Sequence, residues 1–250
     1  ISVDHRTAYC ERVHIAQKWG EKMIAQCQNL KHVYGNGRGL HEATFDIKKG
    51  RIIALAGGNG AGKSTLVRLL TKQEVSEQGE LIWHEDKPIR YMPDDVDFPH
   101  TLTAAEVLKL LASLKKATKE QQENVLREVG LLEVKKQKVR HFSKGMRQRL
   151  NLAQSLLGGD GLLIMDEPTN GLDPYWIAQL KNIIRAEKER GSTVIFSTHM
   201  LSFAQQLADD VIILHEGSVL VAGDLQELLT SHQCTELEQL WLAKIGLGEG

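Results

Sequence analysis

The most constraining feature of the sequence is a glycine-rich octapeptide at residues 57–64, which reads Gly-Gly-Asn-Gly-Ala-Gly-Lys-Ser. It fits the pattern G-x-x-x-x-G-K-[ST] and lies between an apolar run at Ile52–Ala56 and a helical pattern at Thr65–Leu70. Glycines let backbone N–H groups approach a phosphate chain, and a helix N-terminus adds unpaired donors. Lys63 can reach the β- and γ-phosphates, and Ser64 offers a hydroxyl to Mg²⁺. The sequence therefore predicts a strand–loop–helix unit that binds a nucleotide.

Other short apolar runs bounded by turn residues predict buried strands. These runs, including the one before the octapeptide, are Ile52–Ala56, Leu162–Met165, Thr193–Ser197 and Val211–Leu214. Between them, apolar residues at helical spacing predict helices over 177–184 and 200–208. Because strand and helix alternate there, we expect an α/β fold, with a mainly parallel sheet as its core and helices on both faces.

Two further regions have different patterns. Residues 24–49 and 80–92 contain short β-type segments, the last of them Ile89–Tyr91, and we expect these to form a small antiparallel β subdomain. From about 101 to 157 the period is helical and Lys and Glu are frequent, with no strand-like run. We therefore expect a helical subdomain at about 101–157, inserted between two sheet segments.

Composition excludes several functional classes. Among 250 residues, 31 Lys and Arg balance 32 Asp and Glu, giving a formal net charge of -1, so no nucleic-acid partner is expected. The three cysteines, Cys10, Cys27 and Cys234, are far apart, which supports neither a disulfide framework nor a zinc site. No apolar run reaches the roughly 18 residues of a membrane span.

Two carboxylates follow the apolar run Leu162–Met165, namely Asp166 and Glu167. An Asp at the end of a strand beside a phosphate loop can hold Mg²⁺, and a following Glu can polarise an attacking water. His199 follows the strand predicted at Thr193–Ser197 in the same way. Because ligands bind at the carboxyl ends of parallel strands, we expect Gly57, Asp166 and His199 to share one edge of the sheet.

A third segment narrows the class. Residues 142–149 read Phe-Ser-Lys-Gly-Met-Arg-Gln-Arg and precede the two carboxylates, while Gly-Leu-Asp-Pro follows them at 171–174. With these elements in order, the chain resembles the nucleotide-binding domain of ATP-binding-cassette (ABC) transporters over residues 24–243. The eight-residue sequence of 142–149 and a C-terminal helical segment at Thr235–Leu242 resemble the export-type, ABC-2-like group in particular.

The resemblance implies roles for individual residues. ATP would be bound by Tyr34, which would stack on adenine, and by Gly57, Asn59, Gly60, Ala61, Gly62, Lys63, Ser64, Thr65, Ser143, Gly145, Met146 and Asp173. The catalytic residues would be Lys63, Glu167 as general base, and His199. Mg²⁺ would be held by Ser64, Asp94 and Asp166. Two segments depart from the family pattern: residues 142–146 read F-S-K-G-M instead of L-S-G-G-Q, and Asp94 replaces a Gln.

The spacing also bears on partners. Ser143 lies 80 residues after Lys63, at the far end of a helical region, so it is not expected to reach the phosphate loop of its own chain. A second ATPase subunit would supply it, in a homo- or heterodimer that sandwiches ATP. The resemblance implies a transmembrane permease as a separate chain, docking near residues 94–115, and a cytoplasmic site on the inner face of the cell membrane.

Other classes of nucleotide-binding protein remain open at this point. A soluble ABC ATPase that acts on nucleic acid or the ribosome is the alternative, although such proteins usually carry two cassettes or a basic face. A small-molecule kinase would share residues 57–64 but would not need Ser143, Asp173 and His199 in this order. A purely regulatory nucleotide-binding module would not need Glu167 and His199.

The boundaries follow from the same resemblance. We expect an ABC ATPase domain over 23–243 and a tail over 244–250. Residues 1–22 have no counterpart in the family, and the codons for Trp19–Lys22 can encode a purine-rich ribosome-binding tract just before Met23. We therefore expect 1–22 to be leader sequence.

Overall fold

A computed structural model describes residues 22–86 and 88–246 of the chain. The expected leader, apart from Lys22, and residues 247–250 of the expected tail lie outside these ranges. Within them the strands are β1 (Met23–Val33), β2 (Gly39–Lys48), β3 (Ile52–Ala56), β4 (Gln78–Trp83), β5 (Ile89–Met92), β6 (Leu162–Met165), β7 (Thr193–Thr198), β8 (Asp210–His215) and β9 (Ser218–Asp224). The helices are α2 (Lys63–Leu70), α3 (Ala104–Leu114), α4 (Lys119–Glu128), α5 (Lys144–Leu156), α6 (Pro174–Glu189), α7 (Leu201–Leu207), α8 (Leu225–Ser231) and α9 (Leu237–Lys244), with a short 3-10 turn at Val139–His141.

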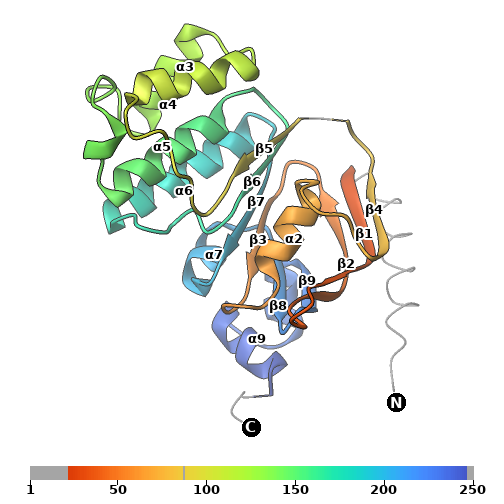
Figure 1. Cartoon of the computed structure of the whole chain (residues 1–250). Coiled ribbons are helices and arrows are strands. Elements are labelled where there is room, and N and C mark those ends of the chain that lie inside the picture. The colour runs from red at the N-terminus through yellow and green to blue at the C-terminus, as the bar shows by residue number, and fades with distance from the viewer. Residues whose placement is uncertain (1–21, 87, 247–250) are drawn as a thin grey trace, which may run out of the picture.

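The strands form one curled sheet in the order β4-β1-β2-β9-β8-β3-β7-β6-β5 (Figure 1). Its centre is parallel, because β3 pairs with β7 and β8, β7 with β6, and β6 with β5 in the same direction. At the other end β1 pairs antiparallel with both β2 and β4. The predicted α/β fold, with a parallel core and an antiparallel β subdomain, is confirmed.

One strand assignment was wrong. Ile89–Tyr91 was expected in the antiparallel sheet, but β5 is the edge strand of the parallel sheet and pairs with β6. The segment is short and carries Arg90 in its middle, a pattern unlike a buried parallel strand. Arg90 is nevertheless 3% exposed, because its guanidinium forms an ion pair with the carboxylate of Glu187 on α6. A contact between residues so far apart in sequence leaves no trace in local periodicity.

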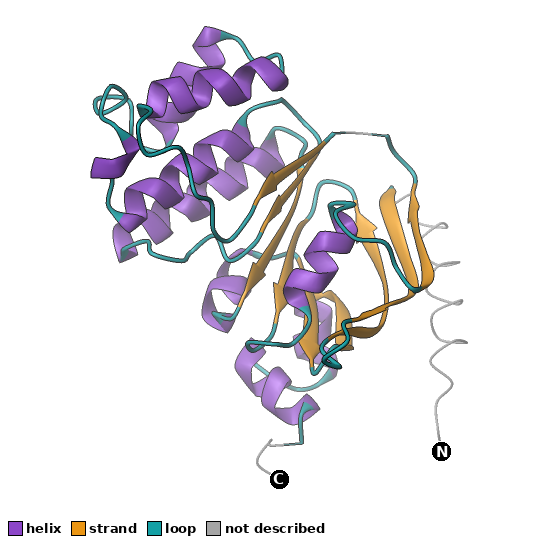
Figure 2. Ribbon diagram, viewed as in Figure 1, coloured by secondary structure: helices purple, strands orange, loops and turns teal. Residues whose placement is uncertain are grey.

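Both faces of the parallel sheet are buried. Along β3, Ile52, Ala54 and Ala56 belong to one apolar cluster, and Ile53 and Leu55 belong to another. The first cluster is completed by apolar residues of α3 to α9, and the second by those of α2 and the antiparallel strands. Figure 2 shows the resulting layers, with α2 separated by the sheet from α7. The central strands are therefore protected from water on both faces, and their carboxyl ends lie along one edge of the sheet.

Helices α3, α4 and α5 pack against one another, at the upper left of Figure 1. Their starts carry strong N-terminal caps: Thr103 and Thr118 each form a capping box, and the hydroxyl of Ser143 accepts the amide hydrogen of Met146. Among the described residues, no helix has the length and apolar character needed to cross a bilayer.

Candidate active site

The carboxyl ends of three neighbouring strands define the site. β3 lies beside β7, with Ala56 opposite Thr198, and β7 lies beside β6, with Phe196 opposite Met165. Gly57, Asp166 and His199 follow these strands directly, so the predicted placement at one sheet edge is confirmed. Loops at this edge can bring side chains from distant parts of the sequence together.

The phosphate loop joins β3 to α2 and depends on glycine at two close approaches. A Cβ atom at Gly57 would lie 2.4 Å from the carbonyl oxygen of Leu214. Gly62 is the N-cap of α2 with φ 98, and a Cβ there would lie 2.8 Å from the carbonyl oxygen of Gly39. Because glycine has no side chain, no side-chain cap covers the first amides of α2. These amides are suitable donors for phosphate oxygens.

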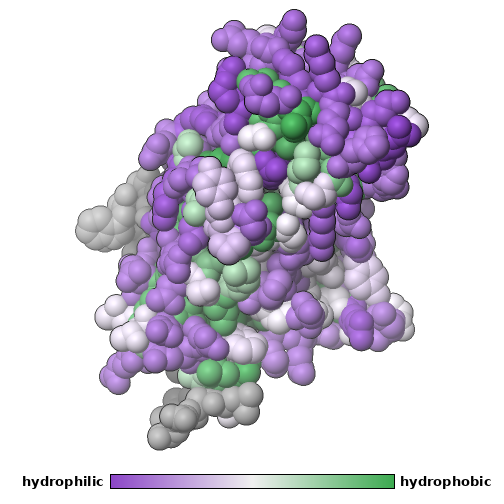
Figure 3. Space-filling view, turned by 90° about the vertical axis from the view of Figure 1, so that its left-hand side faces the viewer, coloured by the Kyte–Doolittle hydropathy of each residue, from purple (hydrophilic) through white to green (hydrophobic). Residues whose placement is uncertain are grey.

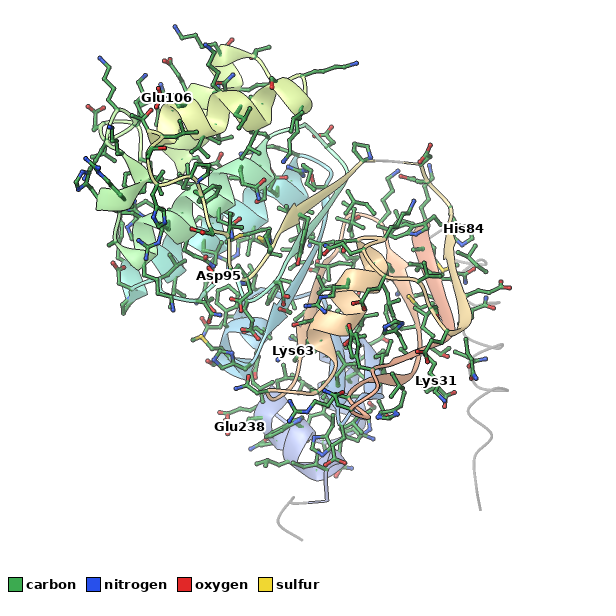
Figure 4. All side chains as sticks on the ribbon, in the orientation of Figure 1. Lys31, Lys63, His84, Asp95, Glu106 and Glu238 are labelled. Carbon is green, nitrogen blue, oxygen red and sulfur yellow. The ribbon has the colours of Figure 1, made fainter. Side chains whose placement is uncertain are left out.

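Lys63, labelled in Figure 4, is the first residue of α2 and is 6% exposed. Its ammonium donates hydrogen bonds to the carbonyl oxygens of Gly57, at 2.7 Å, and Gly58, at 3.1 Å. It also lies 3.2 Å from Oε1 of Glu167. A buried ammonium is held in the loop by dipoles and one carboxylate, all of which it can exchange for phosphate oxygens.

Glu167 lies in a strained backbone conformation. Its φ is 46, in the left-handed region that non-glycine residues rarely adopt. Its backbone N–H donates to the hydroxyl of Ser197 at 2.8 Å, which fixes the turn. The two carboxylate oxygens then diverge, with Oε1 near Lys63 and Oε2 2.9 Å from Nδ1 of His199. His199 itself is half exposed, so the carboxylate connects a buried cation to a group in contact with solvent.

Asp166 is buried, and its surroundings disfavour a negative charge. Burial raises the pKa of its carboxyl, and the nearby charges of Asp94 and Glu167 raise it further, against opposing hydrogen bonds from the hydroxyls of Ser197 and Ser64. Carboxylate and hydroxyl oxygens are the hard ligands that Mg²⁺ prefers, and a cation would relieve the excess negative charge. The donor set of Ser64, Asp94 and Asp166 therefore fits a magnesium ion.

Asp94 is exposed in the loop after β5, and its Oδ1 accepts a hydrogen bond from the amide of Asn170 at 2.6 Å. The same loop is tied to the carboxylate loop by the N–H of Asp166, which donates to the carbonyl oxygen of Met92. The structure therefore brings Asp94 beside the two carboxylates that the sequence singled out.

Ser143, Gly145, Met146 and Asp173 form a separate group at the starts of α5 and α6. Ser143 and Asp173 are exposed N-caps, and their oxygens accept the amide hydrogens of Met146 and Trp176. A Cβ atom at Gly145 would lie 2.9 Å from the carbonyl oxygen of Gly171, so α5 abuts the loop after the carboxylates. In the described parts of the chain, none of the four hydrogen-bonds to the phosphate loop.

Tyr34 lies in the loop after β1 and is tied to the phosphate-loop helix. Its hydroxyl donates to Glu74 at 2.6 Å and accepts from Arg68 on α2 at 3.2 Å. The sequence reasoning missed these partners, as it missed Ser197 and Asn170. A serine one residue before the end of β7 was a usable signal for Ser197 because it lies at the same sheet edge, whereas nothing local marked Arg68 or Glu74.

Comparisons with known proteins agree with this geometry. The family described as "ABC transporter" matches residues 40–170. The chain is 36% identical over 205 residues to the lantibiotic transport ATP-binding protein SrtF of Streptococcus pyogenes, covering 79% of this chain and 90% of that protein. It is 38% identical over 209 residues to the bacitracin transport ATP-binding protein BcrA of Bacillus licheniformis, covering 79% and 68%.

Two further comparisons extend the likeness. The chain is 34% identical over 209 residues to the SkfA peptide export ATP-binding protein SkfE of Bacillus subtilis (strain 168), covering 79% of this chain and 87% of that protein. A solved structure described as the ATP binding subunit of an ABC transporter superposes with a TM-score of 0.81 at 28% identity, covering 89% of this chain and 99% of that one. The phosphate loop and the carboxylate loop lie on one sheet edge, and the relatives are ATP-binding proteins of transporters. This chain therefore belongs to the ABC transporter family and contains its ATP-binding ATPase domain.

Proposed function

We propose that this chain hydrolyses ATP on an ATP-sandwiched dimer and so powers a membrane exporter. The observation that carries the proposal is the contact chain from Lys63 through Glu167 to His199, at the sheet edge where the phosphate loop begins. Three relatives are named for the transport of a lantibiotic, the transport of bacitracin and the export of the SkfA peptide. These names support export and a peptide-like substrate for this chain. The alternative of a soluble ABC ATPase acting on nucleic acid or the ribosome finds no support in these relatives.

In the proposed site, the uncapped amides of residues 60–65 and the ammonium of Lys63 bind the phosphates. Ser64, Asp94 and Asp166 would hold Mg²⁺, which would neutralise charge on the phosphates. In the described ranges no group of three His, Cys, Asp or Glu side chains is arranged to hold a metal alone. This suits Mg²⁺, which usually needs the oxygens of a nucleotide and water to complete its coordination.

Glu167 is the proposed general base. When the ammonium of Lys63 turns to a phosphate, the carboxylate loses its cation and Oε1 becomes free to accept a proton from water. Oε2 stays bonded to His199, which fixes the orientation of the carboxylate. The strained turn at Glu167 and the bond from its N–H to Ser197 hold both oxygens in the site.

The second half of the site is proposed to come from another copy. At the start of α5, Ser143 is exposed and Gly145 is partly exposed. A head-to-tail pair would place these groups, with Met146 and Asp173, against the nucleotide held by the partner's Lys63. ATP would then close the dimer, and hydrolysis would loosen it.

The proposed membrane partner is a separate permease at the inner face of the membrane, docking near residues 94–115. In this range Leu110 and Leu114 lie one turn apart on α3 and expose 56% and 78% of their surface. Figure 3 shows that one face of the molecule is mostly hydrophilic with local apolar patches. Exposed leucines on neighbouring turns of a helix suit contact with an apolar helix.

A direct test is co-expression with a membrane subunit encoded by the adjacent gene, followed by purification of the complex and measurement of ATP hydrolysis. We expect co-purification and turnover that Lys63→Ala abolishes. Lys119→Ala, which removes an exposed lysine at the start of α4, is the matched control and should leave turnover unchanged. Turnover that survives Lys63→Ala would contradict the proposal.

A further inference from the structure

A cluster of polar side chains surrounds the proposed adenine-stacking residue. It consists of His32, Tyr34, Arg68 and Glu74, and we refer to it as the Tyr34 cluster. The phenol hydroxyl donates to Oε2 of Glu74 at 2.6 Å and accepts from Nη1 of Arg68 at 3.2 Å. Arg68 and Glu74 lie 3.4 Å apart, and Nε2 of His32 lies 3.5 Å from the same glutamate. A single carboxylate therefore connects the other three side chains.

The backbone around Glu74 is fixed to β1. Nδ1 of His32 lies 3.0 Å from the carbonyl oxygen of Val75. The hydroxyl of Ser76 and the N–H of Glu77 both donate to the carbonyl oxygen of Lys31, at 3.1 and 2.8 Å. These bonds hold the loop that carries Glu74 beside β1, and so keep its carboxylate within reach of the tyrosine hydroxyl.

The other partner of the tyrosine comes from the phosphate-loop helix. Arg68 lies five residues after Lys63 on α2, or about 7.5 Å along the helix axis. The bond from its guanidinium to the phenol oxygen therefore connects the tyrosine ring to the same helix whose first turn carries Lys63 and Ser64. The ring and the phosphate-binding groups are thus connected to the same helix.

We propose that Glu74 and Arg68 are positioning residues for nucleotide binding, which hold the Tyr34 ring through its hydroxyl in the orientation that stacks on the adenine base. The inference rests on the proposed function, in which Tyr34 contacts adenine. Stacking gains from a ring that is ordered before the base arrives, because the cost of ordering is then not part of binding. His32 meets the ring at 77°, with centroids 5.0 Å apart, so it supports the ring by an edge contact and does not stack on it.

A purely structural role explains the cluster less well. The Arg68 side chain is 49% exposed, and an ion pair this accessible contributes little to stability. Hydrogen bonds between a phenol and two charged groups are, in contrast, directional and well suited to fixing the orientation of a ring.

The test is a comparison of two ligands, Mg-ATP and magnesium tripolyphosphate, by isothermal titration calorimetry on the full chain. Tripolyphosphate has no base, so it reports on the phosphate site alone. We expect Tyr34→Ala to weaken ATP binding roughly 5- to 100-fold and Glu74→Ala, Arg68→Ala or Tyr34→Phe to weaken it about three- to tenfold. Tripolyphosphate affinity should stay unchanged in all four. Glu80→Ala, at an exposed position of β4, is the control and should change neither ligand.

A double variant shows whether Glu74 affects ATP binding through the hydroxyl of Tyr34. In Tyr34→Phe the hydroxyl is already absent, so adding Glu74→Ala should cause no further loss of ATP affinity. Additive losses, or an equal loss of tripolyphosphate, would overturn the proposal and show that Glu74 acts on the phosphates or the fold. If Tyr34→Ala keeps full ATP affinity, both the stacking and its positioning fail, while Lys63→Ala still reports separately on the phosphate site.

Discussion

The proposed active-site residues form two groups, one at the sheet edge and one at the starts of α5 and α6. The two groups differ in burial and in their bonding partners. On the sheet edge, Lys63 and Glu167 are nearly buried and bonded to each other. At the starts of α5 and α6, Ser143 and Asp173 are exposed, and within the described ranges their side chains bond only to the first turns of their own helices. The sheet-edge group is thus assembled within a single chain, whereas the group at the starts of α5 and α6 is exposed at the surface. The difference is what the proposed ATP-sandwiched dimer requires, in which each chain supplies one half of a catalytic site.

The largest expected effect is on the assembled group. Glu167→Gln keeps the size of the side chain but removes the proton acceptor, while Lys63 and Ser64 still hold the nucleotide. We expect turnover to fall by about a hundredfold or more. Unhydrolysed ATP should then keep two copies together, so light scattering with Mg-ATP should give the mass of a dimer. Lys63→Ala should give a monomer. Full ATPase activity in Glu167→Gln would remove the general base from the mechanism.

The next variant adds a change in the exposed group at the starts of α5 and α6. Ser143→Arg, combined with Glu167→Gln, should abolish the dimer while each chain still binds ATP, because a bulky side chain would occupy the γ-phosphate position. The change also removes a helix cap, which costs about 1 kcal/mol. Thr118→Arg removes the cap of α4 in the same manner and should leave the dimer intact. A dimer that ignores Ser143→Arg would contradict the two-half-site arrangement.

The same contrast governs what the sequence could predict. β3 and β6 begin and end where the apolar runs do, and their parallel pairing places Gly57 and Asp166 at one edge. These features are local, and the topology follows from alternation of strand and helix. β5 could not be placed in this way, because its burial depends on the pairing of Arg90 with a residue 97 positions away.

For the site too, the sequence predicted the local features but not the contacts between distant segments. Residues that follow strand ends could be assigned to the edge, but the left-handed turn at Glu167 and the hydroxyl of Ser197 beneath it depend on the packing of two strands. The partners of Tyr34 are 34 and 40 residues away in sequence. Their contact depends on how the loop after α2 is fixed to β1, which no spacing rule expresses.

A third prediction concerns the junction between α6 and β5, away from the chemistry. Glu187 is buried with Arg90, whose Nε has no hydrogen-bond partner among the described residues. Glu187→Ala leaves the guanidinium buried without its carboxylate and should lower the free energy of unfolding by about 3–5 kcal/mol. Urea denaturation measures this. Glu128→Ala breaks the exposed pair with Arg190 and should cost about 0–1 kcal/mol. If both variants lose similar amounts of unfolding free energy, the burial of an ion pair does not determine the cost of breaking it.

A fourth prediction tests Asp94, whose charge acts on Asp166 in the sheet-edge group. Its carboxylate can approach Mg²⁺, but it donates no hydrogen bond and adds charge near the phosphates. We expect Asp94→Gln to retain ATPase activity. Asp94→Ala should lower Mg²⁺-dependent turnover more than ATP affinity, measured by steady-state kinetics and calorimetry. Equal losses in both quantities would make Asp94 a structural residue, bonded to Asn170 for the sake of the loop.

The smallest expected effect is on the connection between α3 and α5. Lys115 follows α3, and its ammonium donates to the carbonyl oxygen of Gln154 on α5 at 2.6 Å. Burial, and then the charge of Arg90, lowers the pKa of Lys115 to about 8. The unfolded chain, with a lysine pKa near 10.4, therefore binds more protons than the folded chain between about pH 8 and 10.4. Charged Lys115 thus destabilises the fold below pH 8, and this penalty disappears as the pH rises through that window.

Lys115→Met removes the titration. Because the neutral amine of the native lysine still donates its hydrogen bond, we expect the native chain to gain stability relative to the variant as the pH increases from 8 to 10.4. The gain should be modest, since the side chain is only partly buried. Thermal unfolding of both proteins across this range measures it, with Lys119→Met as an exposed control. A difference in Tm that does not change with pH would show that folding does not lower the pKa of Lys115, and that the junction between α3 and α5 is more open to water than its packing indicates.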